Sequence, residues 1–177
     1  LRASAARAAP SRRRCSRRVP RCALLAPCAA SLVRTPPPLT IDLARAQVEV
    51  TLEEKVPLMV SALGTPRWLV EECHAVGTKV MSMVGAVRHA PRLEQMGVDI
   101  IVAQGMEAGG HVGTVTTMVL VPSVVDAVSV PVLAAGGIID GRGIAAGMML
   151  GAQGAWIGTR FIATEEANAD PAYKQAL

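Results

Sequence analysis

The sequence of 177 residues is poor in aromatic side chains and lacks a long apolar segment. Its four aromatic residues are too few for a surface that stacks on RNA bases. No apolar run reaches the ~18–20 residues that a membrane-spanning helix needs. We therefore expect neither an RNA-stacking surface nor a transmembrane protein.

Acidic residues and glycine are absent from the first 40 positions. Nine of the 18 basic residues lie there, so this head carries a charge of +9. The body, residues 41–177, combines the other nine basic residues with all 14 acidic ones and has a net charge of −5. The basic pI of 9.2 thus arises from the head, and we expect no nucleic-acid partner for the folded body.

The head contains runs of arginine and a block of three prolines at positions 36–38, a composition typical of disorder. Three interpretations of residues 1–40 stay open. The head is a transit peptide, which would place the protein in an organelle, or a basic arm that binds nucleic acid or anionic lipid. The third interpretation is sequence translated upstream of a truncated enzyme. Without a targeting role for the head, we expect a cytoplasmic protein.

Cysteine and histidine are too sparse to indicate a metal site. Cys15, Cys22 and Cys28 have spacings that match no zinc signature, and no two histidines have metal-ligand spacing with a third ligand. We predict no bound metal and no disulfide framework. Cys73 is isolated in a helical pattern and is expected to be a buried apolar residue.

The body alternates short apolar runs with helical patterns. Strands are predicted at residues 56–63, 78–84, 98–103, 131–135 and 152–157. Helices are predicted at residues 42–54, 66–76, 90–96, 121–128 and 140–150. Several runs are apolar almost throughout, as in strands that are covered on both faces of a parallel sheet. Pro66 and Pro122 are placed near helix starts, and Asp140 is placed as a helix N-cap.

Two α/β architectures fit five successive βα units: a doubly wound sheet and part of a (β/α)8 TIM barrel. Glycine clusters directly follow the strands, and this favours the barrel, whose active-site loops lie at that end. Because five units are fewer than eight, we expect residues 41–177 to form an incomplete, C-terminal part of such a barrel.

One glycine-rich loop follows the predicted strand 98–103, and its sequence is Gln104-Gly105-Met106-Glu107-Ala108-Gly109-Gly110-His111-Val112-Gly113. Its glycines permit a close backbone approach to a ligand. His111, in the middle of the loop, is either a general base or a hydrogen-bonded turn histidine. His74 and His89 are expected to be solvated.

Two more glycine turns follow the last two strands, at Gly136-Gly137 and at Gly158. In a barrel these loops commonly bind phosphate through backbone N–H groups. Arg142 and Arg160 are candidates for phosphate contacts or for ion pairs on helix surfaces, and Asp140 is expected to be a helix cap instead of a catalytic acid. We expect four methionines to serve in packing, namely Met81, Met83, Met148 and Met149.

In this order and spacing, the three segments resemble the nitronate monooxygenase family, formerly called 2-nitropropane dioxygenases, which includes flavin-dependent enoyl-ACP reductases. The residues that carry the resemblance are Gln104-Gly105-x-Glu107-Ala108-Gly109-Gly110-His111-x-Gly113, Ala135-Gly136-Gly137-Ile138-x-Asp140-Gly141 and Gly158-Thr159-Arg160-Phe161. The resemblance covers residues 41–177 and does not extend into the head.

The resemblance implies an FMN-dependent oxidoreductase with a TIM-barrel fold. His111 would be the base that removes the proton α to the nitro group of a neutral nitroalkane. The flavin would then take an electron from the nitronate, and O2 would complete its oxidation to a carbonyl compound and nitrite. The residues implied to bind FMN are Gln104, Gly109, Gly136, Gly137, Trp156, Ile157, Gly158 and Thr159.

Two alternatives to this activity stay open. One is a flavin-dependent enoyl-ACP reductase that uses NAD(P)H, and the other is a non-catalytic fragment. The barrel strands that precede the body in the family, with an Ala-Pro-Met-type segment and a flavin-contacting Asn, have no counterpart in the head. We therefore expect this chain to bind FMN weakly or not at all. The sequence does not indicate an oligomeric state.

Overall fold

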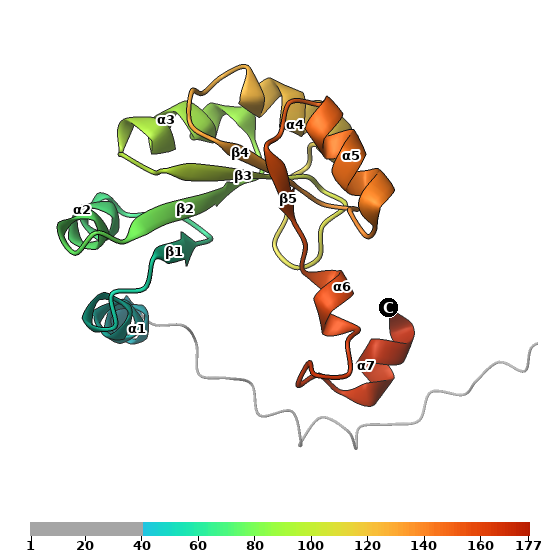
Figure 1. Cartoon of the computed structure of the whole chain (residues 1–177), viewed down its shortest axis with the longest axis horizontal. Coiled ribbons are helices and arrows are strands. Elements are labelled where there is room, and N and C mark those ends of the chain that lie inside the picture. Colours follow the sequence, from blue (N-terminus) through green and yellow to red (C-terminus); the bar gives the residue numbers. More distant parts are fainter. Residues whose placement is uncertain (1–40) are drawn as a thin grey trace, which may run out of the picture. The chain divides into compact units, whose positions relative to one another are not determined.

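The structure, a computed structural model, describes residues 41–177 as an alternation of strands and helices (Figure 1). The disorder expected of residues 1–40 lies outside the described residues. The strands are β1 Leu58–Ser61, β2 Lys79–Val84, β3 Ile100–Gln104, β4 Val132–Ala135 and β5 Gly154–Trp156. The helices are α1 Ile41–Glu53, α2 Arg67–Ala75, the 3-10 helix η1 Val87–His89, α3 Ala90–Gln95, α4 Thr117–Val125, α5 Gly141–Met149, α6 Thr159–Ile162 and α7 Pro171–Ala176.

The five strands form one parallel sheet in the order β1-β2-β3-β4-β5. Every strand therefore pairs with its neighbour in the sequence, and the order never reverses. A doubly wound sheet reverses its strand order at a switch point, whereas a (β/α)8 barrel adds its strands consecutively. The predicted α/β fold of the TIM-barrel class is thus confirmed.

The two faces of the sheet are covered differently. Side chains such as Val80, Ile101 and Val132 point to one face and pack with α2, α4 and neighbouring helices in the main core. Alternate residues, including Met81 and Val102, point to the other face and form a second, smaller apolar cluster. Figure 1 shows α3, α4 and α5 following one another around the outer side of the sheet. The strands are therefore apolar on both faces, as their sequences predict.

Helix α1 is held against α2 mainly by one arginine. The Arg45 guanidinium lies 4.4 Å from the centroid of the Trp68 ring and donates a hydrogen bond of 2.8 Å to Glu72. Val48 of α1 is buried in the main core. A cation-π contact, an ion pair and apolar burial together fix this helix beside the first βα unit.

The five predicted strands and the five predicted helices are all present. Two predictions about them are wrong, namely the start of one helix and the burial of two methionines. Helix α4 begins at Thr117, so Pro122 lies inside the helix and not near its start. The reason is that the Glu107 carboxylate accepts a hydrogen bond from the Thr117 amide, a cap supplied from ten residues away. Met148 and Met149 are exposed on α5, so their predicted role in packing is wrong. The prediction for Cys73 is confirmed, because it is fully buried in the main core.

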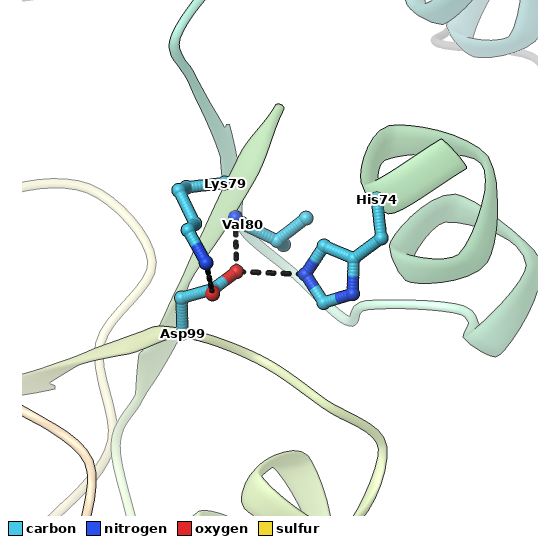
Figure 2. A network of polar contacts seen from close by, with 4 residues as sticks. All are labelled: His74, Lys79, Val80 and Asp99. Carbon is cyan, nitrogen blue, oxygen red and sulfur yellow. Dashed lines mark hydrogen bonds and ion pairs between the residues drawn. The ribbon is translucent and has the colours of Figure 1, made fainter. Parts of the chain in front are cut away.

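Asp99, just before β3, links three segments at the amino end of the sheet (Figure 2). Its carboxylate accepts hydrogen bonds of 2.8 Å from His74 Nε2, Lys79 Nζ and the Val80 amide. His74 is exposed, as predicted, and it is also paired with Asp99. Desolvation raises the pKa of Asp99, but the hydrogen bonds from Lys79, Val80 and His74 outweigh it and hold this pKa below its ordinary value.

We predict that Asp99→Asn lowers the free energy of unfolding by about 1–2 kcal/mol at pH 7, because charge-assisted hydrogen bonds are lost. A carboxylate with a lowered pKa stabilises the fold above its unfolded pKa, and this contribution is lost as the pH falls through the folded value. Urea denaturation should show the difference between wild type and Asp99→Asn shrinking below about pH 3.9. Glu71→Gln, an exposed change on α2, serves as the control. An equal effect of both variants would contradict the assignment.

Candidate active site

An open cleft of about 1490 Å³ lies at the carboxyl edge of the sheet. Segments that follow each of the five strands contribute to its walls, because parallel strands direct all their carboxyl ends to the same edge. Ligand pockets in proteins commonly enclose ~300–1,000 Å³. The cleft is thus large enough for a cofactor and a substrate together.

All nine candidate site residues line this cleft, although they come from three separate loops. The structure brings together Gln104, Gly109, His111, Gly136, Gly137, Trp156, Ile157, Gly158 and Thr159. They follow β3, β4 and β5, which are adjacent in the sheet. Spacing along the sequence did not require this meeting, since the outermost members lie more than 50 positions apart.

His111 is exposed in the loop after β3 and lines the cleft. The Gln104 side chain donates a hydrogen bond of 3.3 Å from Nε2 to the His111 backbone carbonyl. Gln104 is the last residue of β3, so a rigid strand end supports the middle of the loop. The imidazole itself has no hydrogen-bond partner within residues 41–177 and is free to meet a ligand.

The turn after β4 requires glycine at two successive positions. Gly136 has a φ of +107° and Gly137 a φ of +68°, in the region that disfavours other residues. Within the described part of the chain, the amides of Gly136, Gly137 and Gly158 donate to no protein acceptor. These N–H groups therefore remain available for an anion such as a phosphate.

The third loop closes against the first at Gly109. A Cβ placed on Gly109 would lie 3.5 Å from Thr159 Oγ1, so the loops after β3 and β5 lie close together at this point. Trp156, at the end of β5, is 36% exposed and presents part of its indole ring to the cleft. The cleft thus has apolar and polar walls side by side, which suits a flat aromatic ring with a charged tail.

Glu107 ties the first loop to helix α4. Its two carboxylate oxygens accept hydrogen bonds from the Thr117 amide at 2.9 and 3.1 Å, and the Thr117 hydroxyl donates to Oε2 at 2.8 Å. Desolvation raises the pKa of Glu107. Hydrogen bonds from the Glu107 amide and from the amide and hydroxyl of Thr117 outweigh this effect, so the pKa is lower than its ordinary value. The carboxylate is consequently charged at neutral pH. Sequence analysis assigned no role to Glu107 or Thr117.

Asp140 is the N-cap of α5, as predicted, and accepts hydrogen bonds from the amides of Arg142 and Gly143. Its side chain also forms an ion pair with Arg142 at 2.6 Å. Arg142 therefore has the surface ion-pair role that was one of its two predicted alternatives. Neither Asp140 nor Arg160 lines the cleft.

The cleft includes residues that sequence analysis did not select. Arg88, His89 and Arg92 follow β2 on η1 and α3, and all three are exposed beside the cleft. None of them forms an ion pair with another residue in 41–177. We call these three residues the basic rim. Their position directly after a predicted strand was the feature of the sequence that could have identified them, because the loops after barrel strands carry functional residues.

Two further properties can be stated for residues 41–177. No group of three histidine, cysteine, aspartate or glutamate side chains in this region is placed to hold a metal ion. In the same region, no helix has the length and apolar character to cross a membrane.

Consecutive parallel strands, outer helices and a cleft at their carboxyl ends define a (β/α)8-class protein, whose ligand sites usually lie at that end of the strands. Comparison with known proteins agrees with this class. The profile of the family described as nitronate monooxygenase matches residues 28–177. The chain belongs to the nitronate monooxygenase family.

Solved structures share both the fold and much of the sequence. FabK from Thermotoga maritima is 45% identical, with a TM-score of 0.74, over 77% of this chain and 44% of that chain. The nitroalkane oxidase from Streptomyces ansochromogenes is 35% identical, with a TM-score of 0.73, over 76% of this chain and 42% of that chain. The family therefore contains proteins with different names and activities.

A curated relative from Rhodococcus jostii is named (3aS,4S,5R,7aS)-5-hydroxy-7a-methyl-1-oxo-octahydro-1H-indene-4-carboxyl-CoA dehydrogenase. It is 41% identical over 128 residues, which are 72% of this chain and 36% of that protein. The chain thus spans less than half the length of each of these three proteins. The activity and the substrate of the whole protein are therefore left to be proposed.

We predict that Gly136→Ala disrupts the turn after β4. Its new methyl group would lie 2.7 Å from Thr117 Oγ1 and 3.1 Å from the Gly105 carbonyl oxygen, on a backbone whose φ is +107°. The expected loss is about 1–3 kcal/mol in the free energy of unfolding, measured by urea denaturation. Gly141→Ala is the matched control, since a Cβ there meets nothing within 4 Å. Equal stability of the two variants would contradict the close packing described for this turn.

Proposed function

We propose that this chain carries the FMN-binding and catalytic loops of an enzyme that oxidises alkyl nitronates or nitroalkanes with O2, yielding carbonyl compounds and nitrite. The observation that carries the proposal is the meeting of His111, the Gly136-Gly137 turn and the loop after β5 around one cleft. Membership in the nitronate monooxygenase family supports it. When bound, FMN would supply the oxidation of the nitronate.

The residues present fit an FMN group. Gly136 and Gly137 line the cleft, and their amides, which donate to no acceptor in residues 41–177, suit the phosphate. Gly158 and Thr159 lie at the start of the short segment after β5, facing the same cleft. Gln104 and Gly109 supply the opposite wall, and Trp156 and Ile157 supply apolar surface for the ring system.

His111 is proposed as the general base. An imidazole exposed in the cleft can accept the proton α to the nitro group and so convert a neutral nitroalkane into its nitronate. The hydrogen bond from Gln104 to the His111 carbonyl positions the backbone from which the ring extends. A nitronate that is already ionised needs no such proton transfer. The two forms of substrate therefore separate the role of His111 from the rest of the site.

We predict that His111→Ala, in a preparation that binds FMN, lowers turnover of a neutral nitroalkane by about 10²–10⁴-fold, the usual contribution of a positioned base. Turnover of the preformed nitronate should stay close to the wild-type rate. FMN affinity should also persist, because the Gln104 bond goes to the backbone of residue 111 and not to its ring. Undiminished nitroalkane turnover in the variant would exclude His111 as the base.

A second candidate function is the reduction of an enoyl thioester with NAD(P)H through the same FMN site. The basic rim favours it, because Arg88, His89 and Arg92 place positive charge beside the cleft of a body whose net charge is −5. A thioester of coenzyme A or of acyl carrier protein has phosphate groups remote from its reacting carbons. Exposed arginines at the edge of the cleft suit such groups better than a small nitroalkane.

For this second function, we predict that the double variant Arg88→Ala/Arg92→Ala raises the KM for an enoyl-CoA by up to about fivefold, since exposed ion pairs contribute up to ~1 kcal/mol in all. The kcat should change little, because the proposed contacts of the rim are to phosphates remote from the reacting carbons. Arg67→Ala is the control, an exposed arginine on α2 that does not line the cleft. Nitronate oxidation without thioester-dependent NAD(P)H oxidation would reject the second function.

A further inference from the structure

Three backbone segments meet at the side chain of Thr117, the first residue of α4. Its amide and hydroxyl bind the Glu107 carboxylate of the loop after β3, at 2.8–3.1 Å. Its Oγ1 also lies 3.1 Å from the carbonyl oxygen of Gly136, in the turn after β4. One side chain thus contacts both loops that contribute most of the proposed site.

The Thr117 hydroxyl has one proton to donate, and its two nearest acceptors are Glu107 Oε2 and the Gly136 carbonyl oxygen. The Glu107 Oε2 atom is closer, at 2.8 Å, and its negative charge makes it the stronger acceptor. The Ala135 carbonyl, at 3.4 Å, already accepts a bond from the Gly105 amide at 2.9 Å. The hydroxyl therefore donates mainly to Glu107 and shares the same proton with the Gly136 carbonyl in a three-centre hydrogen bond.

Three glycines lie so close to Glu107 and Thr117 that a residue with a side chain would not fit at their positions. A Cβ on Gly105 would overlap the Thr117 hydroxyl, and one on Gly136 would lie 2.7 Å from the same atom. A Cβ on Gly137 would lie 3.3 Å from the Glu107 Cβ atom. The two side chains thus occupy the space that three glycines leave open. The contacts form a single junction between the loops after β3 and β4.

We propose that Glu107 and Thr117 are positioning residues, which fix the His111 loop against the Gly136-Gly137 turn and thereby assemble the ligand cleft. They do so as an ionised carboxylate that caps α4 and a hydroxyl that bridges to the next strand end. Glu107 lies four residues before His111, so loss of the junction frees the loop in which the imidazole is set. The consequence for FMN binding rests on the proposed function, whereas the ordering of the loop does not.

The first test is hydrogen exchange of backbone amides in the full chain without cofactor. Three loop amides report on the junction, because Gly105, Met106 and Ala108 donate to Ala135, Val115 and Gly105. We expect Thr117→Val to speed their exchange about tenfold, which corresponds to ~1.4 kcal/mol, and Thr117→Ser to restore it. The control is Thr116→Val, since the neighbouring side chain is exposed and makes no capping bond.

Amides outside the junction distinguish positioning from general stability. Asp99 and Ile101 donate to Val80 and Pro131 at the other end of β3, so their exchange should be unchanged in Thr117→Val. Faster exchange at those two amides to the same extent as in the loop would overturn the proposal. Wild-type exchange at all three loop amides would overturn it as well.

The second test is titration with FMN, followed by quenching of flavin fluorescence. Thr117→Val and Glu107→Gln should each weaken FMN binding about tenfold relative to wild type, with Thr117→Ser within about twofold of it. Wild-type affinity in both variants would refute the link to the cofactor. Absence of FMN binding by the wild-type chain would count against the proposed function, and the exchange result would then decide the positioning role by itself.

Discussion

The parallel, consecutive pairing of five strands is the constraint on which the rest of this structure depends. Because β1 to β5 all run in one direction, every following loop emerges at the same edge, and loops distant in the sequence share one cleft. Apolar residues on both faces of the strands hold the sheet between the helices and a second apolar cluster. At the opposite edge, Asp99 joins α2, β2 and β3, so the amino ends of the strands are fixed by polar contacts.

The loops of the cleft are positioned both by close backbone packing at glycines and by side-chain contacts. Glycines at 105, 136 and 137 allow two loops to approach closely, and Glu107 and Thr117 fill the space between them. A charged carboxylate satisfies the exposed amide at the start of α4, which would otherwise need water. The arrangement leaves His111 exposed while its backbone is supported from β3 by Gln104.

The cleft is compatible with more than one kind of substrate. The same cleft contains a candidate base, free amides for an anion and a rim of three basic residues, and named relatives act on different compounds. A small nitronate and a phosphate-bearing thioester would use the inner part of the cleft alike. They would differ at the rim, where Arg88 and Arg92 matter for an extended anionic substrate only.

The sequence alone determined the order of the five strands and of five of the helices, the barrel class and the cap at Asp140, and it indicated nine candidate residues that all line the cleft. These features depend on short-range patterns: apolar runs, glycines after strands and a capping aspartate. The tertiary structure decided what depends on distant partners. Helix α4 begins at Thr117 because Glu107 caps it, His74 is paired because Asp99 lies opposite it, and the exposed Met148 and Met149 lie on the outer face of α5. The basic rim joined the site only when parallel pairing placed the end of β2 beside the end of β3.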